Sequence, residues 1–186
     1  KIILGQEGII GSIIGDALLV VYSALGEHSE KMKSYQAVMT GYMIHDITEE
    51  IRAGMREIRD RILEERENLS PGEERVFRAV LIEVGVGIDG GDVFYGNIGS
   101  YERMTNTVIG DTVNSSSRME GLNRIYKAPV ICSEYVKADI IGNVENHGLE
   151  FLELDMVKVK GKDEGKRVYW PVPKKIITAA MRRDMK

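Results

Sequence analysis

The sequence predicts a mixed α/β fold of the α+β kind, with a sheet that helices cover on one face. Two apolar runs rich in β-branched residues, GIIGSII and ALLVVYS, are joined by Gly15-Asp16, a pair typical of a two-residue hairpin turn. A long stretch with apolar residues at helical spacing follows them. Beyond it, short segments with strand and helix character alternate, and no internal repeat is visible.

Composition favours one globular domain. The chain has 186 residues, of which 43% are hydrophobic and 29% charged, unlike a disordered or fibrous protein. We expect residues 1–173 to form the domain and the basic residues 174–186 a tail. Because the formal net charge is -4, we expect no nucleic-acid partner.

The predicted long helix runs from about Glu30 to Asn68, and Ser70-Pro71-Gly72 ends it. The segment AVLIEVGVGIDGGDVFYGNIGS predicts a strand, a glycine-rich turn at Asp89 to Asp92 and a second short strand, which together would form a hairpin. Further predicted elements are a strand in MTNTVIG, a helix from Asp111 to about Tyr126, a strand from Pro129 to Cys132, a helix from Glu134 to Ile141, and a closing hairpin of LEFLELDMVKVKG and GKRVYWPV.

Cysteine usage and hydropathy indicate a cytoplasmic setting. Cys132 is the single cysteine, so it cannot form an internal disulfide, and its apolar neighbours predict a buried strand position. The longest apolar region, Ile9 to Tyr22, is broken by glycines and by Asp16 and is too short to span a bilayer. No signal peptide is visible.

The helix predicted from Asp111 begins with unusually polar residues. Asn114 and Arg118 are four residues apart and therefore lie on the same face. Arginine presents a fork of donors that suits phosphate oxygens, and asparagine can bind a ribose oxygen. The alternative is that Asp111 is only a helix N-cap and Arg118 a surface arginine.

Several motifs, in order, resemble the class III nucleotidyl cyclases, which are the adenylyl and guanylyl cyclase catalytic domains. They are IIGDALLVVYS, GVGIDGGDVFYGNIGSYERMTNTVIGDTVNSSSRMEGLNRIYKAPVICSEYVK and VKVKGK, and they extend over most of residues 8–172. The resemblance implies a ferredoxin-like, palm-like mixed sheet with covering helices.

The resemblance also implies a reaction and its residues. In this family the ribose 3′-hydroxyl attacks the α-phosphate, and two divalent cations, Mg²⁺ or Mn²⁺, are held by two aspartates. Asp16 matches the second of these aspartates. Asn114 and Arg118 match the pair that positions the ribose and stabilises charge on the α-phosphate, and Lys160 matches a lysine that contacts the terminal phosphates.

Base recognition departs from the family pattern. The usual lysine four residues before the hairpin aspartate is replaced by Ser12, whereas Thr107 matches a threonine that accepts from the adenine amino group in some adenylyl cyclases. Guanylyl cyclases place a glutamate and usually a cysteine at these positions. The resemblance therefore implies ATP as substrate, with GTP as the alternative.

The family's first metal-binding aspartate lies on an opening strand, and no residue before Ile9 matches its motif. We expect that strand to precede Lys1, and residues 1–186 alone to have impaired activity. The resemblance further implies a head-to-tail homodimer with shared active sites and a sensory domain upstream.

Two alternatives compete with this interpretation. Gly90-Gly91-Asp92-Val93-Phe94 resembles the signature of the GGDEF diguanylate cyclases, but Val93 replaces its acidic residue. A catalytically silent cyclase-like module that dimerises and relays signals would explain Ser12. It would not explain why Asp16, Asn114 and Arg118 occur together.

Overall fold

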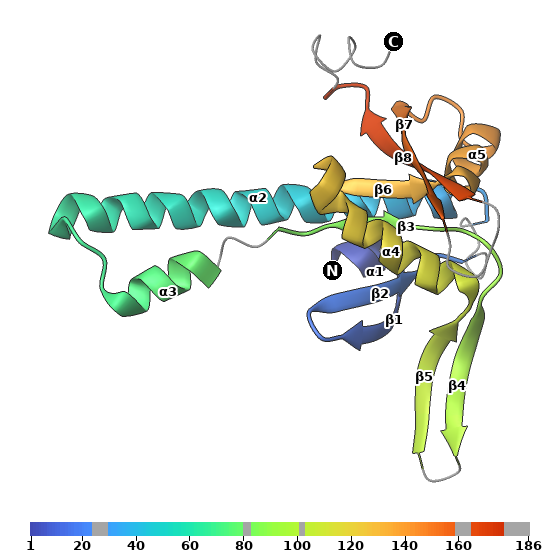
Figure 1. The fold of residues 1–186 in the computed structure, drawn as a ribbon, viewed down its shortest axis with the longest axis horizontal. Coiled ribbons are helices and arrows are strands. Elements are labelled where there is room, and N and C mark those ends of the chain that lie inside the picture. The colour runs from blue at the N-terminus through green and yellow to red at the C-terminus, as the bar shows by residue number, and fades with distance from the viewer. Residues whose placement is uncertain (24–29, 80–82, 101–102, 159–164, 177–186) are drawn as a thin grey trace. The chain divides into compact units, whose positions relative to one another are not determined.

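The computed structural model describes residues 1–23, 30–79, 83–100, 103–158 and 165–176. The chain forms two compact units, Lys1–Gly41 with Gly85–Lys186, and Tyr42–Val84. The described helices are α1 (Ile2–Gly5), α2 (Lys33–Arg66), α3 (Pro71–Ala79), α4 (Asp111–Tyr126) and α5 (Glu134–Asn143) (Figure 1). The described strands are β1 (Ile9–Ile14), β2 (Ala17–Val21), β3 (Val86–Ile88), β4 (Phe94–Ser100), β5 (Arg103–Ile109), β6 (Val130–Ser133), β7 (Leu149–Lys158) and β8 (Gly165–Pro173). Across these residues, every helix is too short or too polar to cross a membrane.

The first unit is built on a four-stranded sheet in the order β3-β6-β8-β7. β3 pairs with β6 in parallel, and β8 runs antiparallel to both β6 and β7. β6 is the most buried of these strands, because its residues Val130, Ile131 and Cys132 are all 0% exposed. The predicted buried position of Cys132 is confirmed, and burial raises the pKa of its thiol.

Two hairpins complete the strands of the first unit. β1 and β2 pair antiparallel around Gly15, whose φ of 63° is the left-handed conformation that glycine tolerates best. β4 and β5 form the second hairpin, from Phe94 opposite Ile109 to Ser100 opposite Arg103.

The predicted hairpin between the strand before Asp89 and the strand after Asp92 is wrong. β3 pairs with β6, and β4 pairs with β5, so the two strands belong to different sheets. The glycine-rich segment carries the chain from one sheet to the other. Gly91 has a φ of 145°, and a Cβ at Gly90 would lie 2.0 Å from the Tyr135 ring, so both glycines serve this crossing.

Helices cover both faces of β3 and β6, which corrects the expectation of one covered face. A Cβ at Gly41 in the first turns of α2 would lie 3.2 Å from Val86 and 3.0 Å from Val130. The next residue of β3, Gly87, faces the backbone of α4 instead. Because consecutive strand residues point to opposite faces, α4 and the first turns of α2, up to Gly41, lie on opposite sides of β3.

The other predicted elements are confirmed with small shifts in their ends. α2 lies within the stretch predicted to be helical, α4 has the predicted bounds, and β7 and β8 form the closing hairpin. In the second unit, α3 was not predicted. It begins directly after Ser70 with Pro71, a residue that the first turn of a helix accepts.

The start of α3 is a capping box. The Ser70 hydroxyl accepts from the Glu73 N–H at 3.3 Å, and the Ser70 N–H donates to the Glu73 carboxylate at 2.8 Å. These hydrogen bonds and an ion pair from Arg66 lower the pKa of Glu73 to about 2. No residue of α3 is buried. The described contacts at the start of this helix are therefore polar: the capping box and the ion pair from Glu73 to Arg66 at the end of α2.

Gly87→Ala is expected to lower the free energy of unfolding by about 3 kcal/mol. The added Cβ would lie 2.2 Å from the carbonyl oxygen of Ser116 and 2.3 Å from the amide nitrogen of Glu120, and backbone atoms cannot rotate away. The matched control is Gly121→Ala, because an added Cβ there has no atom within 4 Å and alanine raises helix propensity by about 0.5–1 kcal/mol. Urea denaturation measures both, and equal stability of the two variants would contradict the close contact.

Candidate active site

The candidate site is built around the junction of β5 and α4. β5 carries Thr107, which is half-buried and lies opposite Gly96, and the next residue, Val108, is buried. The strand ends at Ile109, and α4 begins two residues later at Asp111. The N-cap is Gly110 and not Asp111. The carboxylate of Asp111 therefore lies in the first helical turn, where its negative charge interacts favourably with the helix dipole.

α4 has one exposed polar face and one buried face at its start. Asn114 and Arg118 are both exposed, whereas Ser115 and Met119 are 7% and 2% exposed. Among the described residues, the side chains of Asn114 and Arg118 have no hydrogen-bond or ion-pair partner. The sequence predicted that Asn114 and Arg118 face a ligand, and their side chains are exposed and can bind one.

The backbone of α4 touches the sheet at Gly87 of β3. The backbone of Ser116 and Glu120 passes over Gly87 at a distance that leaves no room for a Cβ. The hydroxyl of Ser116 donates to the carbonyl of Val113 within the helix at 2.9 Å.

The β1–β2 hairpin carries the other predicted residues. Ser12 in β1 is half-buried and pairs with Leu19 of β2. A Cβ at the preceding residue, Gly11, would lie 2.8 Å from Val108 of β5. The structure thus places the strand that carries Ser12 beside the strand that carries Thr107.

Asp16 lies at the tip of the β1–β2 hairpin and is exposed. In the described part of the chain, its carboxylate has no hydrogen-bond or ion-pair partner, and no three metal-binding side chains cluster. The structure does not join Asp16 to Asn114 or Arg118 through any such contact within the described ranges. Lys160 lies outside the described residues.

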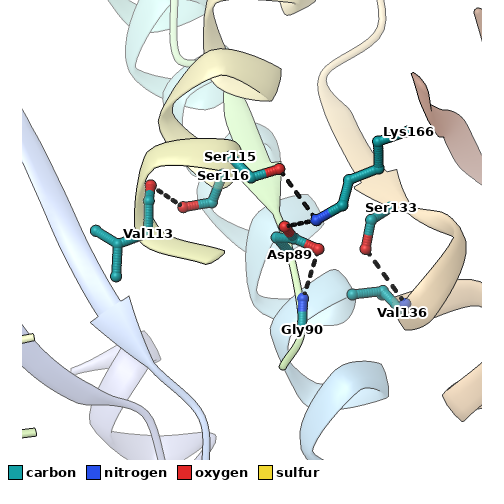
Figure 2. A network of polar contacts seen from close by, with 8 residues as sticks. All are labelled: Asp89, Gly90, Val113, Ser115, Ser116, Ser133, Val136 and Lys166. Carbon is teal, nitrogen blue, oxygen red and sulfur yellow. Dashed lines mark hydrogen bonds and ion pairs between the residues drawn. The ribbon is translucent and has the colours of Figure 1, made fainter. Parts of the chain in front are cut away.

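One group of polar residues near the site was not predicted. The carboxylate of Asp89, directly after β3, forms an ion pair with Lys166 of β8 and accepts from the Gly90 N–H at 2.8 Å (Figure 2). Lys166 also lies 3.3 Å from the hydroxyl of Ser115 in α4. A charged residue after an apolar strand is a signal for such a pair, but its partner is 77 residues away and cannot be identified from spacing.

The far end of α4 is held by Asn123. Its side-chain amide donates to the carbonyl of Ala128 at 2.6 Å and to that of Val86 at 3.4 Å. Asn123 is 6% exposed. It therefore ties the last turns of α4 to β3 and to the loop before β6.

Comparison with known proteins identifies the family of the chain. The family model described as the adenylate and guanylate cyclase catalytic domain matches residues 11–172. The chain belongs to this family. An adenylate cyclase of Anabaena cylindrica is 41% identical over 88 residues, which are 47% of this chain and 17% of that protein.

Solved structures of cyclases share the fold. The adenylyl cyclase CyaB from P. aeruginosa matches with a TM-score of 0.65 and 23% identity, over 92% of this chain and 75% of that one. The guanylate cyclase domain of RhGC from Catenaria anguillulae, solved in complex with GTP, matches with a TM-score of 0.59 and 24% identity, over 92% and 76%. The expected palm-like mixed sheet of the class III type is confirmed.

Asn123→Ala is expected to lower the free energy of unfolding by about 1–3 kcal/mol, because two backbone carbonyls lose a buried donor. The control is Asn143→Ala at the end of α5. Its amide is exposed and bonds only within its own helix, so the change should stay within about 0.5 kcal/mol. Denaturant titration measures the free energy of unfolding of both variants. An equal loss in the two would contradict a stabilising role of the Asn123 hydrogen bonds.

Proposed function

We propose that this domain is an adenylyl cyclase, which converts ATP to 3′,5′-cyclic AMP and pyrophosphate in signal transduction. The observation that carries the proposal is the exposed pair Asn114 and Arg118 on the first turns of α4, without partners among the described residues. The opposite face of the same turns is fixed against β3. A rigid helix that presents a guanidinium and an amide to solvent is suited to hold a nucleotide.

The reaction needs charge stabilisation at the α-phosphate. The 3′-oxygen of the ribose forms a bond to the α-phosphorus, the bond to the β-phosphate oxygen breaks, and the hydroxyl proton passes to solvent. Arg118 binds the α-phosphate oxygens, where negative charge develops in the transition state. Asn114 holds the ribose, and Lys160 contacts the terminal phosphates.

Asp16 is the residue that would hold a divalent cation. Class III domains use such ions in general, and Mg²⁺ is often bound by one or two carboxylates with substrate phosphates and water. A carboxylate that is exposed at a tight hairpin tip and has no described partner fits this role. Two ions, Mg²⁺ or Mn²⁺, would supply Lewis acidity at the phosphates when bound.

Thr107 and Ser12 would recognise adenine. The hydroxyl of Thr107 accepts from the adenine amino group, and Ser12 reaches the purine N1 directly or through water. The contact between Gly11 and Val108 supports a shared pocket for them, since it sets their strands side by side. The glutamate and cysteine typical of guanine recognition are absent at both positions.

A head-to-tail homodimer would complete each site, with Asp16 from one copy and Asn114 and Arg118 from the other. Large apolar side chains beside Asp16 support a covered surface there. Ile13, Ile14 and Leu18 are 73%, 63% and 53% exposed. Monomeric proteins seldom leave such a group of side chains in water.

Arg118→Ala is expected to lower kcat about 100- to 1,000-fold, because it removes a donor to the transition state. Purified protein, with any sequence that its gene encodes before Lys1, is incubated with Mn²⁺ and ATP or GTP, and mass spectrometry identifies the products. The control is Arg124→Ala, an exposed arginine near the other end of α4, which should retain activity. Cyclic GMP as the main product would show that the substrate is GTP and not ATP. A folded dimer that forms neither product would support the silent module.

Mixing two inactive variants tests whether each active site is built from two copies of the chain. Asp16→Ala and Arg118→Ala proteins should each be inactive, and a mixture that exchanges subunits should regain up to about a quarter of the wild-type activity, because half of the dimers would contain one intact site of two. Cyclic AMP formation and subunit exchange are measured together. Exchange without any recovered activity would rule out a site built from two copies.

A further inference from the structure

The structure contains a partly buried ion pair that the proposed reaction does not use directly. The side chain of Asp89 is 0% exposed, and its partner Lys166 is 36% exposed. One carboxylate oxygen of Asp89 binds the Lys166 ammonium, and the other accepts from the Gly90 N–H at 2.8 Å. The carboxylate is thus satisfied at both oxygens, as a buried charge must be.

The same ammonium reaches α4. Lys166 Nζ donates to the Ser115 hydroxyl at 3.3 Å, and Ser115 is 7% exposed (Figure 2). Ser115 follows Asn114 in the chain and precedes Arg118 by three residues. One lysine therefore links the end of β3, the start of β8 and the helical turn that carries the proposed catalytic pair.

Stability alone does not account for this arrangement. Buried ion pairs often stabilise a fold no better than apolar side chains of similar size, because both charges lose their water. Their directional bonds can, however, fix the geometry of the groups that they join. Here the bonds join three elements at a point where the helix carries Asn114 and Arg118.

We propose that Lys166, held by Asp89, is a positioning residue that sets the first turns of α4 and so aims Asn114 and Arg118 at the substrate. In this role Lys166 acts through α4, because its ammonium donates to Asp89 and to Ser115 of that helix. This inference rests on the proposed cyclase activity. It assigns to β8 a part in the geometry of the site that neither the exposed residues nor the motif spacing indicate.

Lys166→Met tests the inference through steady-state kinetics of cyclic AMP formation. The protein is the same as for Arg118→Ala and includes any sequence that its gene encodes before Lys1. A displacement of about 1 Å in catalytic groups costs up to about 100-fold in rate, so kcat should fall about 10- to 100-fold with KM changed less than about 3-fold. The matched control is Arg167→Met on the same strand. Arg167 is 48% exposed and pairs with Glu134 and Glu153 at 3.6 and 3.9 Å, so its loss should leave kcat unchanged.

Two further variants keep the test decisive if Lys166→Met folds poorly. Lys166→Arg retains the charge and should recover part of the lost kcat. Asp89→Asn with Lys166→Met removes both charges, so no ion remains buried alone, yet it should keep the low kcat. A wild-type kcat in the folded double variant would overturn the inference.

Hydrogen exchange separates this inference from the proposed function. In Lys166→Met, the amides of residues 115–119 should exchange faster than in Arg167→Met, while the amides of β6 remain protected. This readout needs no turnover, so it decides the positioning role even if the wild-type protein makes no cyclic nucleotide. Equal exchange of these amides in the two variants would overturn the proposal.

Discussion

The contact between the backbone of α4 and β3 at Gly87 is the constraint on which the site depends. A helix normally packs on a sheet through side chains, which hold the two backbones apart. Here the carbonyl of Ser116 and the amide of Glu120 occupy the space that a Cβ of residue 87 would fill. Glycine in the strand permits this approach, because it has no Cβ to fill the space. The same contact leaves the outer face of the first turns, with Asn114 and Arg118, fixed relative to the sheet.

Three interactions of different kinds hold α4 along its length. Asn123 ties its last turns to backbone carbonyls of Val86 and Ala128, the contact at Gly87 fixes its middle, and Lys166 with Asp89 reaches its start. Asp16, by contrast, is held by a hairpin whose neighbouring side chains are exposed. The two halves of the proposed site thus differ in what fixes them. The helical half is determined within one chain, and the hairpin half would be completed by a second copy.

Local patterns predicted most of the elements and the exposed site residues. The bounds of α4 follow from the strand before it and the polar residues at its start, and the Gly15-Asp16 turn follows from turn chemistry. The pairing of β3 and β4 was predicted wrongly, because adjacency in the chain favours a hairpin, whereas β3 is paired in parallel with β6. Parallel pairing and the ion pair from Asp89 to Lys166 join distant segments, and a single sequence carries no local signal that identifies the partner in either case. The roles of the proposed site residues came from family resemblance and remain predictions; these residues are Ser12, Asp16, Thr107, Asn114, Arg118 and Lys160.

The ion pair between Asp89 and Lys166 also restricts how this chain can change over evolutionary time. Losing Lys166 alone would leave the buried carboxylate of Asp89 without its opposite charge, whereas losing both would leave two neutral side chains. A lineage that loses Lys166 first therefore passes through an unfavourable intermediate, whereas one that loses Asp89 first keeps a lysine that is 36% exposed to water. Related cyclase domains with an aspartate at position 89 should accordingly also carry a lysine at position 166, although the two positions lie 77 residues apart.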